Sequence, residues 1–233
     1  MKIKCEMGKV LMRTSASIIL ILGLASTAFG QSKSELDNRV RKLMAQFDSL
    51  QSNPEARIPA DKLKSALGVI IMERTKGGFI FGYEQGFGIA MVKNKSSWSP
   101  FAFMDSREGS FGAQIGGKST FSVVLLMNEG ARDMLINPKV DFGGEAAGTG
   151  GEDSDGVEGS ITEEDPVLVF GASKGLYGGA VVKGGSVSAN DKANENYYGQ
   201  YYSTKNILFE GKVKASETAA ELAKKLSHAA QGK

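Results

Sequence analysis

The sequence has 233 residues, enough for one domain with a well-packed core, and its 28 basic and 26 acidic residues give a formal net charge of +2. This near balance argues against a general nucleic-acid binder, which needs a strong positive field. A single histidine, His228, and a single cysteine, Cys5, argue against Ser-His-Asp triads, thiolate nucleophiles, disulfides and Cys/His zinc sites, whereas a pair of catalytic carboxylates stays open.

Residues 1–30 have the pattern of a secretory signal peptide. Their basic residues are Lys2, Lys4, Lys9 and Arg13. The apolar run 16–25 follows and is too short to span a bilayer, although a retained membrane anchor is the alternative. Cleavage after Gly30 would remove four basic residues and one acidic residue, leaving 24 basic and 25 acidic. We therefore expect an exported protein, periplasmic or secreted, whose translation starts at Met1 or Met12.

Residues 34–50 predict an amphipathic helix, because apolar residues recur at spacings of three and four. These residues are Leu36, Val40, Leu43, Phe47 and Leu50. Arg39, Arg41 and Lys42 lie off this stripe. Ser34 is the expected N-cap, since its hydroxyl can accept a hydrogen bond from the first-turn amides.

A second, short helix is predicted over 58–68, with Pro59 in its first turn and Gly68 just past its end. We assign 31–57 to the N-terminal helix and a linker. Residues 58–233 are predicted to form a single domain that ends in a helix.

The pattern changes at Val69 to a glycine-rich β region. Within 78–92, large apolar residues alternate with small ones, and a turn is expected near Glu84 and Gln85. Repeated glycines in strands indicate close backbone approach or tight curvature, and the same texture returns in 174–185. The sequence therefore predicts an α+β, mainly β fold, in which an antiparallel, strongly curved sheet closes into a barrel or sandwich between N- and C-terminal helices.

Further elements are predicted along the chain: a strand over 119–128, a short helix over 129–136, a strand over 166–171, a helix or turn over 193–202, and a final helix over 216–230. Ser216 is the expected N-cap of the final helix, and His228 is expected to be solvated near its end. Four tyrosines are expected to pack on the sheet with their hydroxyls outward, with an interfacial surface as the alternative. They are Tyr197, Tyr198, Tyr201 and Tyr202.

Residues Gly112 to Ser119 match the phosphate-loop pattern G-x-x-x-x-G-K-[ST]. That motif requires a strand before the loop and a helix directly after it. Here the following residues are rich in β-branched side chains and predict a strand. We therefore interpret the match as accidental, with Gly116 and Gly117 in a tight turn and Lys118 solvated, and we expect no nucleotide.

Residues 141–165 contain nine acidic and no basic residues and are predicted to form a solvated loop. Their spacing does not match a calcium-binding EF-hand loop. If the loop binds a cation, Asp153, Asp155 and Glu158 are the candidate ligands. No metal or other cofactor is otherwise expected.

Four ordered segments resemble the SYLF domain family, a lipid- and actin-associated family whose bacterial members are exported. They are IPADKLKSALGVIIMERTKGGFIFGYEQGFGIAMVK, SSWSPFAF, GSFGAQIGGKSTFSVVLLMN and FGASKGLYGGAVVKGGSVSANDKANENYYG, which extend from Ile58 to Gly199. The resemblance implies binding to phosphoinositides or other anionic lipids, helped by a basic amphipathic N-terminal helix. We do not extend the eukaryotic actin role to an exported protein.

We therefore predict a non-enzymatic protein of the cell envelope that binds lipids or a membrane surface. The candidate headgroup contacts are Arg39, Arg41, Lys42, Lys62, Lys64, Arg74 and Lys76. Ordinary solvation is the alternative for the last four. A structural or protein-interaction module of the envelope, without lipid specificity, is the alternative function, and a carboxylate-based enzyme is a third.

Overall fold

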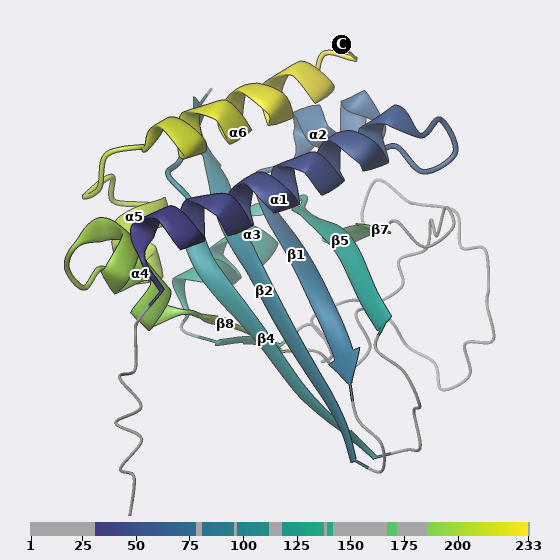
Figure 1. Cartoon of the computed structure of the whole chain (residues 1–233). Helices are drawn as coiled ribbons and strands as arrows, with labels where there is room; N and C mark the ends of the chain where they lie inside the picture. The colour runs from purple at the N-terminus through teal and green to yellow at the C-terminus, as the bar shows by residue number, and fades with distance from the viewer. Residues whose placement is uncertain are drawn as a thin grey trace, which may run out of the picture.

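An antiparallel sheet forms the centre of the protein, and helices cover both of its faces (Figure 1). The computed structural model describes residues 31–77, 81–95, 97–111, 118–137, 139–141, 167–171 and 186–232. The strands are β1 (Gly68–Gly77), β2 (Phe81–Asn94), β3 (Ser97–Trp98), β4 (Ala102–Phe111), β5 (Lys118–Leu126), β6 (Lys139–Asp141), β7 (Val167–Gly171) and β8 (Ser186–Ala189). Their order is β6-β8-β4-β2-β1-β5-β7, with β3 paired to β2, and every described pairing is antiparallel. The predicted α+β class is confirmed.

The helices are α1 (Lys33–Ser52), α2 (Ala60–Ser65), α3 (Glu129–Asp133), the 3-10 turn η1 (Met134–Ile136), α4 (Asp191–Tyr198), α5 (Thr204–Leu208) and α6 (Glu217–Ala229). Ser216 caps α6 as predicted. The N-cap of α1 is Ser32 and not Ser34: the Ser32 hydroxyl accepts from the Glu35 amide while the Glu35 carboxylate accepts from the Ser32 amide. This capping box satisfies two amides that a cap at Ser34 would leave open.

The predicted closure of the sheet into a barrel or sandwich is wrong. Among the described strands, β6 and β7 stand at opposite ends of the order and do not pair. Each face of the sheet packs against helices, so the sheet does not need to cover itself. The glycines of β2 serve close packing instead: a Cβ on Gly88 would lie 2.6 Å from the carbonyl oxygen of Ile71 on β1. Residues 174–185, part of that prediction, lie outside the described residues.

The predicted turn at Glu84 and Gln85 is also wrong, because β2 continues through both residues. Gln85 pairs with Thr75 of β1 on one side and with Arg107 of β4 on the other. A central strand satisfies its backbone on both sides, so polar side chains do not interrupt it. Similarly, Gly68 is the first residue of β1 rather than the cap of the preceding helix, which ends at Ser65.

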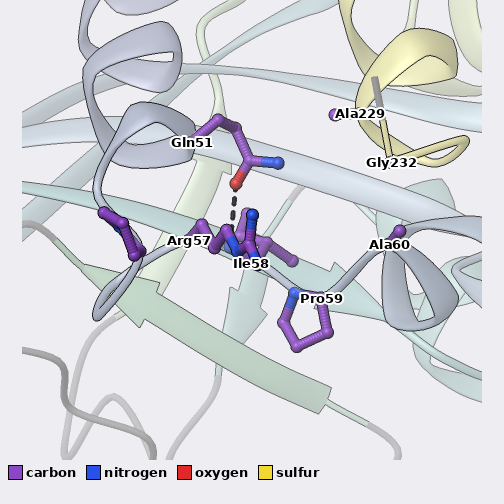
Figure 2. Close-up of a pocket in the computed structure, with 8 residues that line it drawn as sticks. Gln51, Arg57, Ile58, Pro59, Ala60, Ala229 and Gly232 are labelled. Carbon is purple, nitrogen blue, oxygen red and sulfur yellow. Dashed lines mark hydrogen bonds between the residues drawn. The ribbon is translucent and has the colours of Figure 1, made fainter.

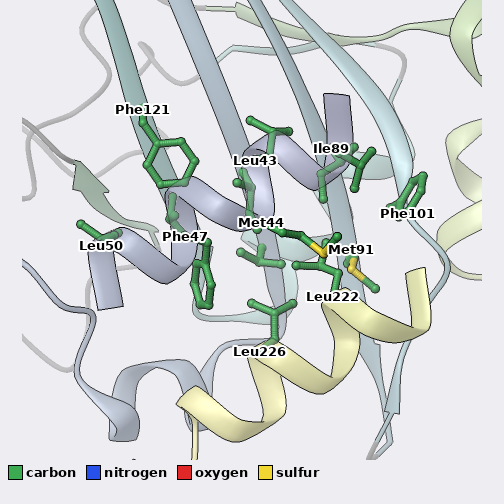
Figure 3. Packing of buried hydrophobic residues seen from close by; sticks show 14 of the residues in the cluster. Leu43, Met44, Phe47, Leu50, Ile89, Met91, Phe101, Phe121, Leu222 and Leu226 are labelled. Atoms are coloured by element: carbon green, nitrogen blue, oxygen red, sulfur yellow. The ribbon is translucent and has the colours of Figure 1, made fainter. Parts of the chain in front are cut away.

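The larger core lies between the sheet and the pair α1 and α6, which lie side by side across one end of the strands (Figure 1). Figure 3 shows α1 side chains directed onto the strands and toward Leu222 and Leu226 of α6. The buried apolar residues of α1 are Leu36, Val40, Leu43, Met44, Phe47 and Leu50. The predicted stripe of α1 is therefore confirmed. The helix shares its core with β1, β2, β4, β5 and β7.

A smaller core lies on the opposite face, where α3, η1 and α5 cover the sheet. Ile70 and Met72 of β1 face this core, whereas Val69 and Ile71 face the core under α1. This alternation follows from the period of two along a strand. Both faces of β1 are apolar, as expected for a strand that is buried on both sides.

Polar side chains attach α4 to the edge of this layered structure. Asn194, fully buried, accepts from the Phe103 amide at 2.8 Å and donates to the Phe103 carbonyl at 3.3 Å, which imitates a neighbouring strand. The Tyr197 hydroxyl donates to Asp37 of α1 at 2.7 Å and lies 2.7 Å from the hydroxyl of Ser216. Burial raises the pKa of Tyr197 to about 12.

The prediction that the tyrosine hydroxyls point outward is wrong for the two residues of α4. Tyr197 makes the bonds described above, and the Tyr198 hydroxyl donates to the Phe101 carbonyl at 2.5 Å. Burial also raises the pKa of Tyr198. Buried hydroxyls need partners, so they turn inward where the protein supplies them. Tyr201, in contrast, is 63% exposed.

The close packing at Gly88 predicts that Gly88→Ala destabilises the protein by about 1–3 kcal/mol, because neither the Ile71 carbonyl nor the Met72 Cβ, 3.1 Å from the new atom, can move cheaply. Urea denaturation measures the effect. The matched control is Gly130→Ala in α3, where the nearest atom would lie at 3.5 Å. It should change stability by no more than about 0.5 kcal/mol. Equal effects of the two variants would contradict the packing argument.

Candidate functional site

The three cations predicted on α1 lie along the seam between this helix, α6 and the sheet. Arg41 forms an ion pair with Glu221 of α6 at 2.7 Å, and Lys42 forms one with Glu73 of β1 at 2.8 Å. The Arg41 and Lys42 side chains are 50% and 63% exposed, so they remain accessible to solvent. These two residues therefore bridge elements while still facing outward.

Arg39 occupies a more enclosed position than its two neighbours. Its guanidinium carbon lies 3.4 Å from the ring centroid of Phe87 on β2. Burial lowers the pKa of Arg39, and the charges of Asp105 and Glu73 oppose that change. A cation stacked on an aromatic ring is held by its quadrupole, so Arg39 mainly packs α1 onto the sheet.

Glu73 is the polar centre of this seam. Its carboxylate accepts from Lys42 and Gln46 of α1 and, at 2.9 Å, from the Ser119 hydroxyl of β5. Burial raises the pKa of Glu73, but the hydrogen bonds that its carboxylate accepts outweigh this effect, so the pKa lies below its ordinary value. A helix and two strands therefore meet at one ionised carboxylate.

The apolar face of α1 is fully used by the core. Leu36 and Val40 are 0% exposed, and Phe47 is 1% exposed. An amphipathic helix that lies in a membrane interface buries this face among lipids, which the folded protein does not permit for α1. Within the described part of the chain, no helix has the length and apolar character needed to cross a bilayer.

Lys62 and Lys64 lie at a different place, where the sequence did not anticipate two further lysines. The strand end of β2 runs beside α2, so Lys93 donates to the Lys64 carbonyl at 2.7 Å and caps the C-terminal end of α2. Lys95 follows two residues later in the turn toward β3. We call Lys62, Lys64, Lys93 and Lys95 the α2 patch.

The α2 patch combines exposed lysines with one that is held in place. Lys62, Lys64 and Lys95 are exposed, and none of them forms an ion pair with another described residue. Burial lowers the pKa of Lys93, whose ammonium lies 5.1 Å from the Trp98 ring centroid. The pairing of a basic strand end with a basic helix arises from tertiary packing, so sequence spacing alone could not reveal it.

The other predicted contacts are not brought to these two places. Arg74 lies next to Gly86 and Met72, and Met72 belongs to the core on the opposite face from α1. The side chain of Lys76 lies outside the described residues, as do Gly112–Gly117, Asp153, Asp155 and Glu158. The strand predicted after the phosphate-loop match is confirmed, because β5 begins at Lys118 and runs antiparallel to β1.

A pocket of about 530 Å³ lies beside α2, on the side of its first turn (Figure 2). It is bounded by the end of α1, the loop to α2 and the end of α6. Its lining residues are Gln51, Pro54, Arg57, Ile58, Pro59, Ala60, Ala229 and Gly232. This volume falls in the range of small-molecule sites in proteins.

Comparison with known proteins identifies the family. Residues 107–229, more than half of the chain, match the family model Ysc84, described as "Las17-binding protein actin regulator". The chain belongs to this family. The match begins in β4 and extends to the end of α6. No solved structure matches the chain.

Several curated proteins resemble this Ysc84-family member. Protein YSC84 of Saccharomyces cerevisiae is 29% identical over 71% of this chain and 36% of its own length. LAS seventeen-binding protein 3 of the same organism is 26% identical over 65% of this chain and 34% of its own length. The human SH3 domain-containing YSC84-like protein 1 is 25% identical over 73% and 52%, respectively. The chain thus spans about a third to a half of these relatives.

The contacts of Glu73 predict that Glu73→Gln lowers the stability of this family member by about 1 kcal/mol at neutral pH, because the charge-assisted hydrogen bonds are lost. A depressed folded-state pKa gives stabilisation that is complete above the unfolded value of 4.5 and is lost as pH falls through the folded value. The variant should therefore lose less stability than wild type between about pH 6 and about pH 3.

Denaturant titrations across this pH range measure the difference. The matched control is Glu221→Gln, which removes the exposed partner of Arg41 and should cost no more than about 0.5 kcal/mol. If Glu73→Gln and wild type lose stability in parallel on acidification, the ionised Glu73 does not hold α1 on the sheet.

Proposed function

We propose that this protein is a non-enzymatic component of the cell envelope that binds anionic membrane surfaces, including phosphoinositide-type headgroups, after its export. The observation that carries the proposal is the α2 patch, in which four lysines gather around one short helix. The SYLF-type motifs support it, because this family is associated with lipids and actin.

The contact that we propose is peripheral and electrostatic. The apolar face of α1 is buried, so insertion of this helix would require loss of the core. Each lysine near an anionic surface contributes about 1 kcal/mol, so the three exposed lysines of the α2 patch supply about 3 kcal/mol. Binding of this strength is reversible and weakens with salt.

A structural or protein-interaction role is the second candidate. The family description and the name LAS seventeen-binding protein 3 both refer to binding of a protein. Tyr201, 63% exposed beside α4, offers the kind of aromatic side chain that is enriched in protein interfaces. This function predicts a protein ligand and no preference among lipids.

Vesicle co-sedimentation tests the lipid proposal. Wild type should pellet with vesicles that contain phosphatidylglycerol, less with pure phosphatidylcholine, and be released by salt. The double variant Lys62→Glu with Lys64→Glu should bind about tenfold more weakly, because two attractions become repulsions.

The matched control for charge is Lys192→Glu with Lys214→Glu, which changes two exposed lysines of other elements. It should retain most of the binding. Equal weakening by both double variants would show that net charge acts rather than the α2 patch. Pelleting that ignores both lipid charge and salt would contradict the proposal, and no pelleting would favour the protein partner.

A further inference from the structure

The pocket beside α2 presents hydrogen-bond donors. The side-chain oxygen of Gln51 accepts from the Ile58 amide at 2.8 Å, which fixes the orientation of the Gln51 side chain. Its amide nitrogen is then directed away from Ile58, toward the end of α6 near Ala229 and Gly232 (Figure 2). This NH₂ group is a donor only.

Arg57 supplies the second polar side chain of the pocket and also carries donors only. The remaining lining residues are apolar or small: Pro54, Ile58, Pro59, Ala60, Ala229 and Gly232. No carboxylate lines the pocket, although Glu55 and Asp61 are exposed nearby in the chain. The pocket therefore favours a ligand group that is rich in acceptors and negatively charged.

We propose that this pocket binds a phosphate group carried on a small polar headgroup. A phosphate oxygen accepts well from a guanidinium and an amide, and the flanking prolines and alanines suit the carbon skeleton of the headgroup. Lys62 and Lys64 on α2 add positive potential close to the pocket, since Ala60 of the same helix forms part of its wall.

The phosphate can belong to a soluble ester or to a lipid, and only the lipid source rests on the proposed function. In the lipid case, the α2 patch attracts the membrane surface and the pocket selects one headgroup. In the soluble case, the pocket acts without a membrane. The two sources share the same recognition chemistry, so the experiment includes both.

Nuclear magnetic resonance titration of the full chain with glycerol 3-phosphate tests the pocket. We expect saturable shifts of the Gln51 side-chain amide and of the backbone amides of Ala60 and Gly232. Gln51→Glu keeps an oxygen for the Ile58 amide but replaces the donor with a negative charge, so it should bind at least about tenfold more weakly. Arg57→Gln should also weaken binding.

Matched controls separate the pocket from general charge. Gln200→Glu makes the same substitution at an exposed position between α4 and α5. Lys214→Gln removes one positive charge, as Arg57→Gln does, just before α6, whose far end borders the pocket. Both controls should bind glycerol 3-phosphate as wild type does. Non-saturating shifts over surface lysines, or wild-type affinity in Gln51→Glu, would overturn the proposal.

Vesicles that contain phosphatidic acid test the lipid source with the same variants. Weaker vesicle binding by Gln51→Glu than by Gln200→Glu supports a lipid phosphate in the pocket. If the two variants bind vesicles equally and the ester does not bind, the pocket proposal fails while the proposed function stands. If the ester binds in the pocket but vesicles do not bind, the proposed function fails and the soluble source stands.

Discussion

The burial of the apolar stripe of α1 against the sheet is the contact on which the rest of the structure depends. Six side chains of this helix lie in the core, and complete burial of each contributes about 1.5–3 kcal/mol. Even after allowance for a compact unfolded chain, the total is comparable to the whole stability of a domain, about 5–15 kcal/mol. The helix therefore cannot leave the sheet without loss of the fold, and any ligand must meet the protein with α1 in place.

Polar groups fix the orientation that this burial alone would leave open. Glu73 joins α1 to β1 and β5, and Tyr197 joins α4 to α1 and to the cap of α6. Asn194 attaches α4 to β4 through both backbone groups of Phe103. Buried polar groups without partners are costly, so these pairs select one arrangement of helices among several that would bury similar apolar area.

The sequence predicted the elements whose signals are local and missed those that depend on tertiary pairing. The stripe of α1, the strand at Lys118 and the cap at Ser216 follow from the period and chemistry of nearby residues. The path of β2 through Gln85 depends on partners in β1 and β4 that are distant along the chain. The lysines at the end of β2 joined α2 for the same reason, and no spacing rule connects Lys93 to the Lys64 carbonyl.

The near balance of charge does not conflict with a role at anionic surfaces. Salt at physiological strength screens exposed charges beyond about 8 Å, so a distant surface senses the local patch more than the net charge. Lysines around α2 act within that range, whereas Arg41 and Lys42 already face carboxylates of the same protein. Charge concentrated at one short helix thus provides attraction in one direction, and the donors of Gln51 and Arg57 next to it provide the short-range selectivity that attraction lacks.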